Sequence, residues 1–227
     1  MFDYTGTDNL ELMVEAVNYN AFLLALVRNE VGPGQSVLDF GAGIGTFASA
    51  LAQHGVAVRC VEPDPRQRER IKAAGMVAHA DLDGLADGCI DLLYSLNVLE
   101  HIEDDMAVLR QWHNKVKPGG RVLIYVPAFQ LLYSSMDRMV GHCRRYTRGE
   151  LSDKVQQAGF VVLRNEYVDS VGFLASLLFK AFGSDDGSIN RQALIAYDRY
   201  VFPLSRLMDK SFKHLLGKNV LMVAQRR

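Results

Sequence analysis

The feature that most constrains the fold is a regular alternation of short apolar runs and helix-like segments between residues 36 and 126. Strands are predicted at residues 36–40, 56–61, 76–80, 90–95 and 121–126, and helices at residues 46–54, 65–74 and 104–115. Strands as apolar as these are buried on both faces, which is typical of a parallel sheet covered by helices. The alternation therefore predicts an α/β fold built on an open, doubly wound sheet.

Further segments flank this unit. After Val126, the stretch "PAFQLLYSSMDRMVGHCRRYTRGE" has no clean period, and connections of such length are usually functional or disordered. The other predicted elements are a helix at about residues 8–30, a helix capped by Thr147 and ended by Gly159, a strand at 160–168, helices at 170–182 and 188–214, and a last strand from Asn219. With no repeat and no linker, we expect one domain over residues 1–227. It would carry a lid at about 127–146 and an apolar helical elaboration at about 170–214.

Composition excludes several classes of protein. A net charge of −1 over 227 residues provides no basic field for nucleic acid. Three dispersed cysteines form neither a disulfide framework nor a zinc signature. The first residues lack the basic start of a signal peptide, and the most apolar run, Val171 to Phe179, is too short to span a bilayer. We therefore expect a cytoplasmic protein without a transmembrane segment. Weak peripheral membrane contact and a homodimer both stay open.

A glycine-rich turn, "SVLDFGAGIGTF", follows the first predicted strand. Gly41 and Gly43 fit the dinucleotide pattern G-x-G-x-x-G, but Thr46 stands where its last glycine belongs, and the third glycine is Gly45. We expect the amides of the turn to face a ligand that approaches the backbone closely. Asp39, just before the glycines, would repel a pyrophosphate and attract a ligand that carries an amine and a positive charge.

Two further acids end neighbouring strands. Glu62, in "CVEPDP", can accept both hydrogen bonds from a ribose diol. Asp81, in "HADLDGL", either accepts from an adenine amino group or belongs to a simple turn with Asp83. Since ligands of open α/β sheets bind beyond the carboxyl ends of the strands, these acids and the glycine turn indicate an adenosine with an amino-acid tail and no phosphates.

Four segments in order resemble the motifs of class I S-adenosylmethionine-dependent methyltransferases: "VLDFGAGIGTF", "VEPDP", "LLYSLNVLEHI" and "VKPGGRVLIYVP". The resemblance implies a seven-stranded Rossmann-like sheet of order 3-2-1-4-5-7-6, with residues 219–225 as the antiparallel seventh strand, and S-adenosylmethionine as the cofactor. "NYN" at residues 18–20 and "GHCRRYT" at residues 141–147 are similar to small methyltransferase domains of glycan or small-metabolite pathways.

The cofactor contacts expected from the turn, the strand ends and the resemblance are Tyr19, Asp39, Gly41, Ala42, Gly43, Gly45, Glu62, Pro63, Asp81, Leu82 and Asn97. For Tyr19 a place in the core is the alternative.

Catalytic and substrate-binding groups are expected around the lid. His101 and His142 are the candidate catalytic residues, although His101 could instead order a turn. Tyr133, Arg144, Arg145 and Tyr146 are the candidate substrate contacts. One arginine would clamp an anionic group, whereas the alternative is that both form ion pairs with acids such as Asp137 or Glu150. The acids at residues 103–105 are expected to complement a helix dipole rather than hold magnesium, and no metal is expected.

The function that follows is methyl transfer from S-adenosylmethionine to a small-molecule or glycan-type acceptor, at a hydroxyl or an amine. "SLNVLEH" after the fourth strand lacks the (N/D)-P-P-(Y/F) pattern usual in nucleic-acid N-methyltransferases. Two alternatives are an NAD-type oxidoreductase and a non-catalytic scaffold that keeps the cofactor-binding fold.

Overall fold

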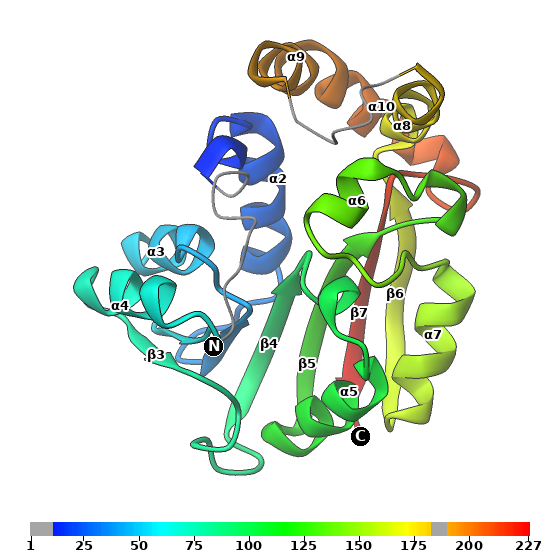
Figure 1. Cartoon of the computed structure of the whole chain (residues 1–227). Helices are drawn as coiled ribbons and strands as arrows, with labels where there is room; N and C mark the ends of the chain where they lie inside the picture. The colour runs from blue at the N-terminus through cyan, green and yellow to red at the C-terminus, as the bar shows by residue number, and fades with distance from the viewer. Residues whose placement is uncertain (1–10, 183–189) are drawn as a thin grey trace.

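The computed structural model describes residues 11–182 and 190–227, and these form an α/β structure around one sheet (Figure 1). The strands are β1 (Val37–Phe40), β2 (Val58–Val61), β3 (Val77–His79), β4 (Ile90–Leu96), β5 (Val116–Pro127), β6 (Phe160–Val168) and β7 (Asn219–Arg226). Their order is β3-β2-β1-β4-β5-β7-β6, and β7 is antiparallel to both of its neighbours. The predicted fold class and strand order are confirmed.

Helices cover both faces of the sheet. They are α2 (Val17–Arg28), α3 (Thr46–Gln53), α4 (Pro65–Ala73), α5 (Asp105–Lys115), α6 (Ser135–Met139), α7 (Arg148–Gln157), α8 (Ser170–Phe182), α9 (Arg191–Ala196) and α10 (Phe202–Phe212), with short turns η1 (Leu99–His101), η2 (Gln130–Leu132) and η3 (Tyr197–Val201). Because successive strand residues point to opposite faces, Leu93 packs with α5 and α7, whereas Leu92 and Tyr94 pack with α2, α3 and α4. The two cores make the sheet doubly wound, as the apolar strands predict.

Two predicted helices have different bounds, for reasons that lie far away in the sequence. The helix expected at residues 8–30, of which 8–10 lie outside the described residues, is interrupted: residues 11–13 are helical, residues 14–16 are not, and α2 begins at Val17. There the Asp198 carboxylate accepts hydrogen bonds from the backbone of Asn18 (2.9 Å) and Tyr19 (2.8 Å). The helix expected at 188–214 is divided into α9, the π-helical stretch η3 and α10. Pro203, which lacks an N–H group, stands in the first turn of α10, where a proline is tolerated.

The segment expected to be a lid is more ordered than its sequence pattern indicates. It contains η2 and α6, and an isolated parallel bridge between Ala128 and Tyr146 ties its two ends together. The helix that follows is capped as predicted, since Thr147 accepts from the Glu150 N–H and Gly159 adopts a φ of 101°.

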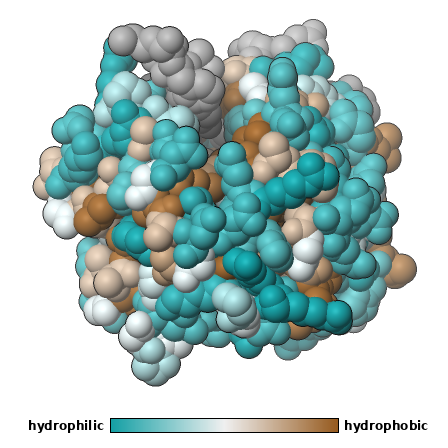
Figure 2. Space-filling view, turned by 90° about the horizontal axis from the view of Figure 1, so that it is seen from below, coloured by the Kyte–Doolittle hydropathy of each residue, from teal (hydrophilic) through white to brown (hydrophobic). Residues whose placement is uncertain are grey.

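The two ends of the strands differ in what covers them. At the carboxyl ends of β4 and β5, toward which their arrows point in Figure 1, lie α6, α8, α9 and α10. The face of the molecule at the opposite ends of these strands, seen from below in Figure 2, is mostly hydrophilic, with apolar residues scattered among polar ones. Within the described residues, no helix combines the length and the apolar character that crossing a membrane requires.

Candidate active site

A pocket of about 660 Å³ lies at the carboxyl ends of the strands. That volume is within the usual range for small-molecule sites, and this edge is where open α/β sheets bind ligands. The predicted site residues that line it are Tyr19, Gly41, Gly43, Glu62, Pro63, Asp81, Leu82, Asn97, His101, His142 and Arg145. Predicted cofactor contacts and predicted catalytic residues therefore share one cavity.

The glycine turn has a different role from the one expected. The N–H groups of Gly41 and Ala42 donate to the Val61 carbonyl (2.8 and 3.1 Å), and the Gly43 N–H donates to Glu62 (2.7 Å), so these amides do not face a ligand. Gly41 has a φ of 79°, and a Cβ there would lie 2.4 Å from a methyl carbon of Val98. The glycines are thus required for the backbone shape, which lets the turn pass close to the loop after β4.

Glu62 braces the turn from the end of β2. Its Oε2 accepts from Gly43 (2.7 Å) and its Oε1 accepts from the Asp64 N–H (2.9 Å). Burial raises the pKa of Glu62, and these two hydrogen bonds oppose the rise. Each carboxylate oxygen can accept a second hydrogen bond, so Glu62 can receive a diol from the pocket while it holds the turn.

Asp39 lies beneath the turn and does not line the pocket. It is 3% exposed, and its Oδ2 has no hydrogen-bond partner among the described residues. Burial raises the pKa of Asp39 to about 7; the Tyr94 hydroxyl lowers it and the charge of Glu62 raises it further. Burial therefore favours the protonated form of this carboxyl far more than water would.

Two other predicted contacts, Ala42 and Gly45, also lie outside the pocket lining. Gly45 precedes α3 with a φ of 80°, and a Cβ there would approach Ile71 to 3.1 Å. Both residues shape the turn rather than contact the cavity.

Asn97 and Tyr19 form the wall above β4. Asn97 has a φ of 55°, a left-handed conformation that asparagine tolerates better than most residues. Its Nδ2 donates to the Tyr19 hydroxyl (3.3 Å), and the Tyr19 ring packs edge-on against Tyr125 and Phe202. Burial raises the pKa of Tyr19 to about 12. Tyr19 belongs both to the pocket wall and to the packing around it, so its two expected roles are compatible.

The third strand end contributes Asp81 and Leu82. Asp81 is exposed, and its Oδ1 accepts from the Asp83 N–H (3.0 Å), which makes the turn that was the alternative to adenine binding. Both residues line the pocket, so the turn and the ligand contact do not exclude each other.

Comparison of the sequence with known proteins identifies the family of this chain. A model of the methyltransferase domain family matches residues 13–165, well over half of the chain. The chain belongs to the class I S-adenosylmethionine-dependent methyltransferase family. An uncharacterized methyltransferase of Mycobacterium sp. (strain JLS) is 36% identical over 96 residues, which is 40% of this chain and 38% of that relative. The match thus spans less than half the length of the mycobacterial methyltransferase.

Solved structures share the fold at low sequence identity. The S-adenosylmethionine-dependent methyltransferase from Mesorhizobium loti is 20% identical, with a TM-score of 0.58 over 89% of this chain and 96% of the other. Geranyl diphosphate C-methyltransferase from Streptomyces coelicolor A3(2), solved with Mg²⁺, geranyl diphosphate and S-adenosyl-L-homocysteine, is 15% identical, with a TM-score of 0.65 over 91% and 79%. The methyltransferase fold is therefore retained while most residues differ.

The lid brings His142 and Arg145 to the pocket, which both residues line. The Arg145 guanidinium donates to both oxygens of Asp137 (2.8 and 2.9 Å), and His142 Nδ1 lies 2.7 Å from Asp137 Oδ1. Burial alone would raise the pKa of Asp137, but the hydrogen bonds from His142 and Arg145 outweigh it and hold that pKa well below its usual range. Asp137 is thus an anion that fixes both side chains. The ion pair between Arg145 and Asp137 is the one that the sequence analysis left open.

The other three candidate substrate contacts do not line the pocket. Arg144 donates to Asp105 (3.0 Å) and to the Glu103 carbonyl (2.7 Å), and the buried Tyr146 hydroxyl donates to the same Asp105 (2.9 Å). Tyr133 donates to the His142 carbonyl (2.7 Å). These residues hold the lid in place, and Asp105 on α5 accepts from Arg144 and Tyr146 of the lid and from Lys154 of α7.

The loop after β4 brings Glu100 and His101 against the lid. The Cys143 N–H donates to the Glu100 carbonyl (2.7 Å), and the rings of His101 and His142 meet edge-on with centroids 4.6 Å apart. Burial raises the pKa of Glu100 to about 8, and burial together with the nearby His142 lowers the pKa of His101 to about 4. The two candidate catalytic histidines are therefore brought together, with a buried carboxyl group beside them.

Glu100 and Lys218 are among the pocket residues that the sequence analysis missed. Glu100 stood in a recognised motif, but nothing in "LEHI" reveals that its side chain points inward. Lys218 precedes β7 and lines the pocket; burial lowers its pKa, while the charge of Asp169 opposes this. An isolated lysine between a helix and a strand carries no sequence signal of its own.

Proposed function

We propose that this methyltransferase transfers the methyl group of S-adenosylmethionine to a hydroxyl or an amine of a small-molecule or glycan-type acceptor. The observation that carries the proposal is that one pocket joins two sets of groups. Glu62, suited to a ribose diol, lies on one side, and His101, His142 and Glu100 lie on the other. The first side would hold the nucleoside and the second the acceptor.

The reaction is an in-line displacement. A lone pair of the acceptor oxygen or nitrogen forms a bond to the methyl carbon, the carbon–sulfur bond breaks with its electron pair on sulfur, and the acceptor proton leaves to a base or to water. The thioether product is neutral and a good leaving group, so the protein mainly aligns the nucleophile, excludes water and assists proton removal. His142, fixed by Asp137, is suited to that last task.

The first prediction concerns the choice of cofactor. We expect saturable binding of S-adenosylmethionine and S-adenosylhomocysteine by calorimetric titration and no binding of NADH, because Asp39 and Glu62 disfavour a pyrophosphate. Mass spectrometry of acceptor mixtures incubated with methyl-labelled cofactor then tests for a methylated product. Tight NADH binding without S-adenosylhomocysteine binding would favour the oxidoreductase alternative, and cofactor binding without any product would favour the scaffold.

The second prediction separates the two lid arginines. Arg145→Ala should lower catalytic efficiency about 10- to 150-fold, the usual value of a charge-assisted contact, with S-adenosylhomocysteine affinity nearly unchanged. Arg144→Ala is the matched control, because Arg144 contacts Asp105 outside the pocket and should mainly lower the melting temperature. Steady-state kinetics, calorimetry and thermal melting on both variants give the comparison. Intact turnover in Arg145→Ala would assign this arginine a purely structural role.

The third prediction concerns assembly. We propose a homodimer formed through α8 and α10, since the two helices pack together and expose apolar side chains, among them Leu178 (61%) and Leu207 (60%). Leu178→Glu combined with Leu207→Glu should then convert a dimer to a monomer in light scattering across a concentration series, with cofactor binding retained. A wild-type protein that is monomeric throughout the series would contradict the proposal.

A further inference from the structure

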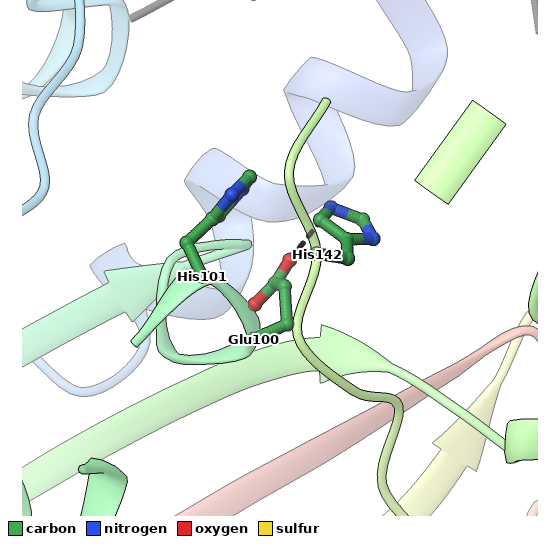
Figure 3. A group of neighbouring side chains, drawn as sticks. All are labelled: Glu100, His101 and His142. Atoms are coloured by element: carbon green, nitrogen blue, oxygen red, sulfur yellow. Dashed lines mark ion pairs between the residues drawn. The ribbon is translucent and has the colours of Figure 1, made fainter. Parts of the chain in front are cut away.

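Glu100, His101 and His142 form a cluster that the methyl-transfer reaction does not by itself require. Glu100 and His101 come from η1 and His142 from the loop after α6; in Figure 3 the Glu100 carboxylate points toward the His142 ring. One potential ligand atom from each residue lies within 4.8 Å of the other two. All three residues line the pocket.

The cluster contains a buried acceptor without a donor. Glu100 is 0% exposed, and neither of its carboxylate oxygens receives a hydrogen bond from the side chain or backbone of another described residue. A buried ionised carboxylate without a donor is costly, so burial keeps Glu100 protonated unless a positive partner such as a cation stabilises its ionised form.

The tautomer of His142 leaves a second acceptor atom near the Glu100 carboxyl. Asp137 is held as an anion by Arg145 and can only accept, so the 2.7 Å contact assigns the proton to Nδ1 of His142. Nε2 then presents a lone pair, and it lies 3.7 Å from Oε1 of Glu100, which is too long for a hydrogen bond. With Glu100 ionised, Oε1 and Nε2 are two acceptors that face each other, and this distance leaves room for a cation between them.

The groups behind the two histidines are those found behind metal-bound imidazoles. A metal-ligating histidine usually donates its second N–H to a carboxylate or a backbone carbonyl, which orients the ring. His142 has Asp137 in that position, and His101 hydrogen-bonds to backbone groups of Val140 and Gly141. Both rings are therefore oriented before any ion arrives.

We propose that Glu100, His101 and His142 bind one divalent transition-metal ion, with zinc as the best match. Two imidazoles and one carboxylate are a known zinc ligand set with a fourth position left open, whereas magnesium and calcium prefer oxygen ligands alone. Zinc–ligand bonds of about 2.1 Å place tetrahedral ligand atoms about 3.4 Å apart, so the side chains need to close by only about an ångström from their present positions. A fourth ligand would come from the pocket.

The open position connects the ion to the acceptor. An acceptor hydroxyl bound there would lose its proton to solvent more readily, because a metal ion lowers the pKa of a bound oxygen. This role rests on the proposed function and would replace proton removal by His142, because the ion would occupy the Nε2 lone pair of that residue. The metal site itself does not rest on the proposed function.

Metal binding by the whole chain tests the site without an activity assay. We expect elemental analysis of protein dialysed against zinc to give one equivalent per chain, and Co²⁺ to give visible absorption bands of a four-coordinate site. Glu100→Gln and His142→Ala should each weaken zinc binding by more than about 100-fold, since even groups that only orient a ligand are worth 10- to 100-fold. The exposed His54 lies outside the cluster, and His54→Ala should bind zinc as the wild type does.

Thermal melting with S-adenosylhomocysteine shows whether each variant is folded. No saturable zinc binding by the wild type, or equal binding by a folded Glu100→Gln variant, would overturn the site. A variant that does not fold leaves the decision to the wild-type stoichiometry and to the other substitution. If the wild type binds zinc but transfers no methyl group, the metal site stands and the proposed function fails; if EDTA-treated, zinc-free protein keeps full turnover, the role of the ion in the reaction fails.

Discussion

Replacing Asp39 with asparagine is expected to weaken cofactor binding and at the same time to stabilise the ligand-free protein. The buried carboxylate is the proposed attraction for the positively charged amino-acid part of S-adenosylmethionine. Because Asp39 does not line the pocket, its attraction acts across the turn, and its loss should lower S-adenosylhomocysteine affinity about 10-fold, or about 1.4 kcal/mol. Calorimetric titration of wild type and variant gives this difference directly.

The stability effect follows from the pKa of Asp39, which rises from 3.8 to about 7 on folding. The folded state therefore binds more protons than the unfolded state between these values, and the free energy of unfolding falls as the pH rises through that window. The loss is on the order of 4 kcal/mol and is complete above about pH 7. The Asp39→Asn variant, whose side-chain amide has no proton to lose in this range, would not show it.

Denaturant unfolding of the ligand-free protein between pH 4 and pH 8 measures this difference. The Asp39→Asn profile should be flatter than that of the wild type, while Asp153→Asn, at an exposed position on α7, should leave the profile unchanged. S-adenosylhomocysteine affinity of the wild type should also increase toward pH 8, because the ligand needs the carboxylate. Parallel stability profiles for wild type and Asp39→Asn would contradict this account.

Glu62→Ala should have the second large effect, because one side chain serves both the ligand and the turn. Its removal takes away the proposed ribose acceptor and leaves the N–H groups of Gly43 and Asp64 without their partner. We expect S-adenosylhomocysteine affinity to fall by at least about 1.5–3 kcal/mol, the range for hydrogen bonds to a charged group. The melting temperature should fall as well, since an orphaned buried N–H is itself costly.

Glu62→Gln separates the two contributions. Glutamine keeps one acceptor oxygen and so should retain part of the turn while it loses half of the diol recognition. The exposed Glu69, on α4, is the surface control. Cofactor affinity that is unchanged in Glu62→Ala would exclude Glu62 as the ribose contact and would reopen the assignment of this whole side of the pocket.

The sheet was predictable from the sequence because its signals are local. Apolar runs separated by turn residues predicted the bounds of β1, β4 and β6 to within one residue. The end of α7 was predictable because Gly159, which follows it, can adopt a positive φ. The start of α2 was not predictable, because a carboxylate about 180 positions away caps it. Contacts of that kind leave no trace in the periodicity of the helix that they shape.

In the candidate site, too, the features with local sequence signals were predictable and those that depend on distant residues were not. The glycine turn and Glu62 could be found because the strand end and the turn are contiguous in sequence. The direction of the turn amides could not, because it depends on Val61 of the neighbouring strand. The roles of Glu100 and Asp137 could not be predicted either, because they depend on contacts that form only when the lid folds onto η1.

The inner position of β7 has a consequence for how the protein is made. β5 and β6 do not pair with each other; each pairs with β7, the strand that leaves the ribosome after both. At about 5–20 residues per second, the stretch from the end of β6 to the end of β7 takes roughly 3–12 s to synthesise. During that interval β5 and β6 lack the strand that pairs with both, so the sheet can be completed only after β7 has left the ribosome.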